Sequence, residues 1–194
     1  LLLHLAHHGD ETNREDHLAL DTGRGLLVHF EGLVPVSHRD HQSSADLQLV
    51  DQGLGDLFVI RVAGNIVAPS QVGSVEFAAA RFHTRLVVVL GHSDCGAIVA
   101  TLEELLQPGS SQSRNLRSIV DRVRPSVDEM MRTELRNDLD TLVDHAVRAN
   151  VDVSVNHLRH GSEILEQLTE TNDLLIVGAE YSVTTGEVEF FHEE

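Results

Sequence analysis

The stretch "RLVVVLGHSDCGAI", residues 85–98, decides the fold. Its first half, 85–91, is a continuous apolar run, which is typical of a strand buried on both faces of a parallel sheet. Its second half opens the segment 95–106, whose apolar residues recur at helical spacing. His92 therefore stands at the carboxyl end of a predicted strand, and Cys95, the only cysteine of the chain, stands at the start of a predicted helix.

The rest of the sequence alternates between strands and helices. We predict strands over 56–64, 173–181 and 188–191, with a turn at 184–187 that returns the last of them beside its neighbour as an edge strand. We predict helices in the second half of 70–82 and over about 115–132, 134–149 and 152–168, with a loop at 109–113. This order predicts an α/β fold with a mostly parallel β-sheet flanked by helices. With no internal repeat and no linker, residues 1–194 are expected to form a single domain.

Composition excludes several classes of function. The formal net charge is −17 over 194 residues, and every basic residue is an arginine. Such an acidic surface repels phosphate backbones, so we expect no nucleic-acid partner. Without lysine there is no Schiff-base chemistry and no ordinary P-loop. Since no apolar run approaches the roughly 20 residues that cross a bilayer, we expect no membrane partner and a cytoplasmic protein.

The positions of His92 and Cys95 indicate a metal site. Ligands of open α/β sheets bind beyond the carboxyl ends of the strands, where His92 is expected. A helix start favours a thiolate, and imidazole with thiolate is a donor pair that suits zinc. An arbitrary H-x-x-C is more often a buried cysteine beside a hydrogen-bonded histidine, and two ligands do not complete a zinc site.

Longer stretches around this pair resemble a known family. "GDLFVIRVAGNIV" (55–67), "GSVEFAAARFHTRLVVVLGHSDCGAI" (73–98), "NVDVSVNHLRHGSEILEQL" (150–168) and "LLIVGAEYSVTTGEVEFF" (174–191) are similar to the β-class carbonic anhydrases, over roughly residues 46–191. The resemblance implies a β-carbonic-anhydrase-like fold, Zn2+ as cofactor with His92 and Cys95 as metal ligands, and CO2 and bicarbonate as substrate and product. It also implies a homodimer or higher even oligomer, with 1–25 as an N-terminal helical arm. The backbone at Ala63, Gly64 and Asn65 would lie near the site, and we assign Gly64 and Asn65 to substrate positioning.

One part of the family pattern is missing from this chain. The family carries C-x-D-x-R upstream, supplying the third zinc ligand and an Asp–Arg pair, whereas the chain reads "VPVSHRDHQSSADLQLVDQGLGDLF" (34–58). With one inserted residue, His38 falls on the missing cysteine, Asp40 on the aspartate and Gln42 on the arginine. His38 is then the third metal ligand, and Asp40 and Gln42 are the catalytic candidates.

A second register is open to the same segment. Without the insertion, Arg39 falls on the ligand and His41 on the aspartate, which removes both functions. We prefer the first register because it keeps a metal-competent residue and the carboxylate. A proline is poorly tolerated in a central strand, so Pro35 indicates that 26–44 is remodelled or forms a mobile loop. A third interpretation makes His38 and His41 solvated loop histidines.

The substituted ligand changes the expected chemistry. Zinc with two thiolates and one imidazole has no net charge, whereas one thiolate and two imidazoles leave +1, which lowers the pKa of a bound water further. Asp40 would orient that water or bind the metal directly, and Gln42 cannot form the ion pair with which an arginine holds Asp40 away. The predicted activity is reversible CO2 hydration, weak or pH-gated. The alternatives are a catalytically impaired homologue with a structural or regulatory role, and a zinc hydrolase acting on another small substrate.

Overall fold

The computed structural model describes residues 2–3, 26–30, 57–107 and 113–191. Its strands are β1 (Leu2–Leu3), β2 (Leu26–Phe30), β3 (Leu57–Arg61), β4 (Leu86–His92), β5 (Leu175–Tyr181) and β6 (Val188–Phe190). Its α-helices are α2 (Pro69–Phe82), α3 (Gly96–Leu106), α4 (Arg114–Val127), α5 (Leu139–His160) and α6 (Glu163–Glu170). Short 3-10 turns are η1 (Ala63–Asn65), η2 (Met130–Arg132) and η3 (Glu134–Asn137).

The sheet is mixed, with parallel strands at its centre. Its order is β1-β2-β4-β5-β6, in which β2, β4 and β5 run parallel and β1 and β6 are antiparallel at the edges. The register pairs Phe30 with Leu90 and His92 with Tyr181. Strand β3 lies against β2. The predicted α/β architecture with a mostly parallel centre and an antiparallel last strand is confirmed.

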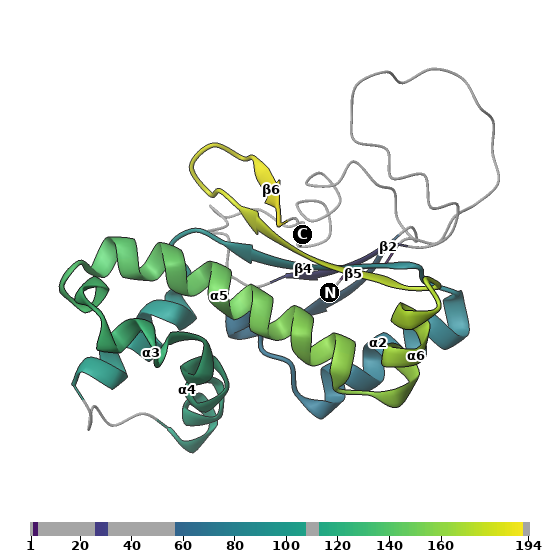
Figure 1. The fold of residues 1–194 in the computed structure, drawn as a ribbon, viewed down its shortest axis with the longest axis horizontal. Coiled ribbons are helices and arrows are strands. Elements are labelled where there is room, and N and C mark those ends of the chain that lie inside the picture. Colours follow the sequence, from purple (N-terminus) through teal and green to yellow (C-terminus); the bar gives the residue numbers. More distant parts are fainter. Residues whose placement is uncertain (1, 4–25, 31–56, 108–112, 192–194) are drawn as a thin grey trace, which may run out of the picture.

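Strand β4 is central because both of its faces are apolar. Val87 and Val89 pack with Ile176 of β5 against helices α2, α5 and α6, and Figure 1 shows the described helices on that side of the sheet. On the opposite face, Val88 forms a separate cluster with the two leucines of the strand, Leu86 and Leu90. Every residue of β4 from Leu86 to Gly91 is buried, which confirms the prediction from the continuous apolar run.

Helix α5 corrects the predicted helix boundaries. We predicted one helix to end near 149 and another to begin near 152, whereas α5 runs unbroken from Leu139 to His160. The polar residue Asn150 does not interrupt the helix because its side chain is buried and donates to the carbonyl of Gly64 at 2.6 Å. The chain breaks at Gly161 instead, before Ser162 caps α6 through its hydroxyl.

Other boundaries also differ from the sequence prediction. The strand predicted over 56–64 ends at Arg61, because the chain turns into η1 at Ala63, and Gly64 within that turn has a left-handed backbone (φ 74°). Helix α2 includes the whole of 69–82, and α4 ends at Val127 rather than near 132. The helical arm predicted for 1–25 lies outside the described residues, apart from the two residues of β1. Of the segment 26–44, only β2 is described.

Within the described residues, no helix is both long enough and apolar enough to span a bilayer.

Candidate metal centre

His92 and Cys95 lie where β4 passes into α3. His92 is the last residue of β4, and Cys95 is the N-cap of α3. Asp94 between them has a left-handed backbone (φ 57°), which allows the chain to turn tightly from the strand into the helix. The strand end and the helix start predicted from the sequence are therefore confirmed, and they place both residues at the carboxyl edge of the sheet.

The imidazole of His92 is oriented by the backbone. Its Nδ1 lies 2.8 Å from the carbonyl oxygen of Ser93, and because a carbonyl only accepts, Nδ1 carries the proton. In the neutral ring Nε2 then has a free lone pair. Nε2 is buried and has no hydrogen-bond partner among the described residues. A buried polar atom without a partner is rare, and this arrangement is the usual one for a histidine that ligates a metal.

The thiol of Cys95 is buried at the positive end of a helix. Cys95 is 1% exposed, and its Sγ accepts a hydrogen bond from the N–H of Ile98 at 3.4 Å. The helix N-terminus favours negative charge at this position. His92 and Cys95 thus fit zinc in donor type, as an imidazole nitrogen and a thiol at a helix N-terminus. Among the described residues, no group of three or more His, Cys, Asp or Glu side chains is arranged to hold a metal ion.

The other predicted ligand and catalytic residues belong to the segment between β2 and β3. His38, Asp40 and Gln42 lie outside the described residues, as do Arg39 and His41 of the alternative register. Strand β2 ends at Phe30 opposite Leu90 of β4, so the chain leaves β2 at the edge of the sheet where His92 lies.

Gly64 and Asn65, predicted to position substrate, form a braced turn beside β4. The side chain of Asn65 is buried and donates to the carbonyl of Leu90 at 2.6 Å, two residues before His92. From α5, Asn150 bonds the Gly64 carbonyl and Ser154 bonds the Asn65 carbonyl, at 2.6 and 2.7 Å. The carboxamide of Asn65 therefore ties η1 to the strand that carries His92, and its role toward a substrate stays a prediction.

Sequence reasoning missed Asn150 and Ser154. They lie 86 and 89 residues from the carbonyls that they bond. The signal that could have found them is that Asn150 and Ser154 are polar residues at helical spacing among the apolar residues of α5. Ser93 was also passed over, although its carbonyl oxygen accepts the His92 proton.

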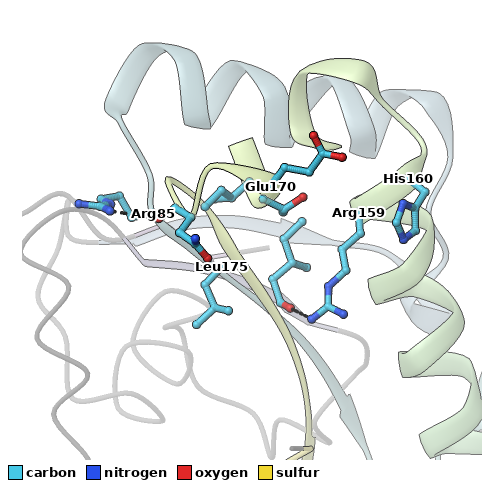
Figure 2. A pocket seen from close by; sticks show the side chains of 9 residues that line it. Arg85, Arg159, His160, Glu170 and Leu175 are labelled. Carbon is cyan, nitrogen blue, oxygen red and sulfur yellow. Dashed lines mark hydrogen bonds between the residues drawn. The ribbon is translucent and has the colours of Figure 1, made fainter. Parts of the chain in front are cut away.

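A cavity of about 740 Å³ lies at the opposite end of the strands. Figure 2 shows Arg85, which precedes β4, Leu175 at the start of β5, and Arg159 and His160 at the end of α5. The guanidinium groups of Arg85 and Arg159 donate to the backbone carbonyls of Asn172 and Ile176. Because this cavity is at the amino ends of β4 and β5, it is separate from the His92–Cys95 edge.

Comparison with known proteins identifies the family of the chain. The family model described as carbonic anhydrase matches residues 44–188, a range that contains His92 and Cys95 and begins after Gln42. A carbonic anhydrase of Mycolicibacterium smegmatis is 37% identical over 150 residues, which cover 77% of this chain and 69% of the relative.

Solved structures share the fold. A Coccomyxa β-carbonic anhydrase in complex with acetazolamide superposes with a TM-score of 0.68 at 21% identity, covering 86% of this chain and 72% of that one. A tetrameric β-carbonic anhydrase from Sordaria macrospora gives a TM-score of 0.64 at 17% identity, covering 86% and 80%. The chain belongs to the carbonic anhydrase family and has the fold of its β class.

Proposed function

We propose that this chain catalyses the reversible hydration of CO2 to bicarbonate with Zn2+ held by His92, Cys95 and a third ligand. The observation that carries the proposal is the buried Nε2 of His92, which has no hydrogen-bond partner in the part of the chain that the structure describes, while Nδ1 donates to the carbonyl of Ser93. Membership of the carbonic anhydrase family supports the reaction, and the pairing of imidazole with the capping thiol of Cys95 supports the metal.

The chain's own residues would have distinct parts in this reaction. Zinc, when bound, supplies the Lewis acidity that makes water a nucleophile near neutral pH. His92 presents Nε2 because its other nitrogen donates to Ser93, and the helix dipole of α3 supports a charged Cys95. In the preferred register Asp40 accepts a hydrogen bond from the attacking water and orients it. Gln42 cannot hold Asp40 by an ion pair, so we expect a low or pH-dependent rate.

The decisive experiment measures zinc content and CO2 hydration together. We expect about one zinc per chain and hydration that is lost on removal of the metal and restored by adding it back, with Cys95→Ser as the inactive comparison. A folded protein that holds zinc but does not hydrate CO2 would instead favour the impaired homologue, and a panel of small ester and sulfur substrates would then test for hydrolysis.

The third ligand is tested by variants at His38 and Arg39. If His38 binds zinc, His38→Ala lowers the zinc affinity by more than the roughly 10–100-fold that is typical of losing a residue hydrogen-bonded to a metal ligand. His38→Cys keeps zinc bound, and because the second thiolate removes one positive charge from the site, the pKa of the bound water rises and activity moves to higher pH. Competition with a chelator measures the affinities. Unchanged binding by His38→Ala, with tighter binding by Arg39→Cys, would establish the other register.

We also propose that the protein is a homodimer or a higher even oligomer. The Sordaria macrospora neighbour is described as tetrameric, and the described surface exposes large apolar side chains, among them Phe77 and Leu175. Light scattering at micromolar concentration is expected to give an even multiple of the chain mass. A monomer mass across that concentration range would contradict the proposal.

A further inference from the structure

Ser93 connects the end of β4 to the hairpin formed by β5 and β6. Its N–H donates to the carbonyl of Tyr181 at 3.0 Å, and its Oγ accepts from the N–H of Val183 at 3.1 Å. Its own carbonyl accepts the proton of His92 Nδ1 at 2.8 Å. The same residue is therefore bonded to the hairpin through its amide and hydroxyl and to the imidazole through its carbonyl.

The hairpin to which Ser93 is hydrogen-bonded is stabilised by hydrogen bonds within its own turn. The N–H of Ser182 donates to the Glu187 carbonyl, and the N–H of Gly186 donates to the Ser182 carbonyl, each at 2.9 Å. Gly186 has a left-handed backbone (φ 80°), which this turn requires and glycine adopts without strain. Beyond the turn, β6 pairs antiparallel with β5. Val183 is thus presented to Ser93 from a turn of defined geometry.

Arg148 of α5 fastens the same hairpin to the helical layer. Its guanidinium donates to Glu180 of β5 at 2.8 Å and to Glu189 of β6, and it lies over the ring of Phe191 at 5.0 Å. The hydrogen bond to Glu189, followed by that to Glu180, raises the pKa of Arg148 above its ordinary value. Glu180 pairs with Gly91, the residue before His92. The hairpin is consequently held at the strand position next to the metal centre.

We propose that Ser93 is a positioning residue for His92: by bonding its amide and hydroxyl to the β5–β6 hairpin, it holds its carbonyl where His92 Nδ1 donates and Nε2 faces the metal. The inference rests on the proposed zinc site. It adds a function for the hydroxyl of Ser93 and for the hairpin that the ligand pair alone does not contain.

The physical reason lies in the two tautomers of a neutral imidazole. Which nitrogen keeps the proton is set by the hydrogen bond that the other makes, so the position of the acceptor selects the tautomer. The Ser93 carbonyl can leave that position by rotation of the backbone at Ser93. Bonds to Tyr181 and Val183 restrain this rotation because they join neighbouring atoms of Ser93 to a separate element. Losing the hydroxyl bond frees one of the two restraints while keeping the carbonyl itself.

The test compares Ser93→Ala with Ser93→Thr, which keeps a hydroxyl. Ser118→Ala is the matched control, since Ser118 is an exposed serine of α4 whose hydroxyl bonds the backbone carbonyl of Asn115, away from the hairpin. The first readout is the imidazole tautomer of His92 in zinc-free protein, by 15N NMR at an alkaline pH at which the spectrum shows a neutral ring. Loss of its signals in His92→Ala assigns them. The second readout is zinc affinity by chelator competition.

We expect the parent, Ser93→Thr and Ser118→Ala to carry the His92 proton on Nδ1. Ser93→Ala should show a measurable population with the proton on Nε2 and bind zinc about tenfold more weakly, the lower end of the range for partners of metal ligands. The inference is overturned if Ser93→Ala keeps the parent's tautomer and binds zinc as Ser118→Ala does. It is equally overturned if zinc-free parent protein carries the proton on Nε2. A parent that binds no zinc would refute the proposed function, and the tautomer comparison would still decide the role of Ser93.

Discussion

Replacing Cys95 by serine should strongly weaken zinc binding and abolish CO2 hydration while leaving the fold intact. The thiolate is one of the proposed ligands, and a neutral hydroxyl is a poor substitute for it. Serine keeps the second function of the residue, because Cys95 is the N-cap of α3 and serine is among the preferred N-cap residues. Zinc affinity is expected to fall by more than the roughly 10–100-fold typical of losing a partner of a ligand, measured by chelator competition.

Matched variants separate the metal from the helix cap. Cys95→Ala removes ligand and cap together. Its free energy of unfolding should therefore also fall, by the roughly 0.5–2 kcal/mol that a lost cap costs. His92→Ala should lose zinc to a similar degree as Cys95→Ser. His145→Ala removes an exposed histidine of α5 and should bind zinc as the parent does. Retention of parental zinc affinity by Cys95→Ser would refute the proposed metal centre.

Gly91→Ala should destabilise the protein strongly for the addition of a single methyl group. A Cβ at Gly91 would lie 2.6 Å from Cγ2 of Val151 and 3.3 Å from Cγ1 of Val147, both on α5. Valine in a helix has essentially one side-chain rotamer, so neither contact can turn away and α5 must shift from the sheet. Overpacking of this kind costs about 1–3 kcal/mol, and at about 2–4 °C per kcal/mol for a chain of this size, thermal unfolding should begin several degrees lower.

A second glycine provides the control. Gly73 lies within α2, and a Cβ there would meet nothing within 4 Å. Gly73→Ala should therefore stabilise the helix by about 0.5–1 kcal/mol. Combining Gly91→Ala with Val151→Ala removes the closer clash, so the double variant should lose less stability than the two single losses added together. A melting temperature of Gly91→Ala equal to or above that of the parent would show that the α5–β4 contact is looser than described.

The contact at Gly91 also relates stability to the site. Gly91 precedes His92 and pairs with Glu180, so a displacement of β4 from α5 moves the strand end that carries the imidazole. A histidine that must meet a metal in a defined direction tolerates little displacement. Zinc affinity of Gly91→Ala should therefore fall together with its stability.

The strand and helix on either side of His92 and Cys95 could be predicted because their signals are local. An unbroken apolar run from Leu86 to Leu90 is typical of a strand buried on both faces, and the apolar spacing after Cys95 is typical of a helix. The long helix α5 was wrongly predicted as two helices divided near residue 150, where the polar Asn150 stands between apolar residues. Its bond to the Gly64 carbonyl, which makes the polar residue compatible with the core, comes from a segment 86 residues away.

The amino-acid sequence by itself determined the α/β fold, the placement of His92 at a strand end and of Cys95 at a helix start, and the resemblance to the carbonic anhydrases. These properties follow from apolar periodicity and residue type, which are recorded along the chain. Tertiary structure alone decided that His92 Nδ1 donates to Ser93, that Ser93 is held by Tyr181 and Val183, and that α5 braces the Gly64–Asn65 turn. Such hydrogen bonds depend on which distant backbone groups meet once the sheet, helices and hairpin have packed, and local sequence does not specify their partners.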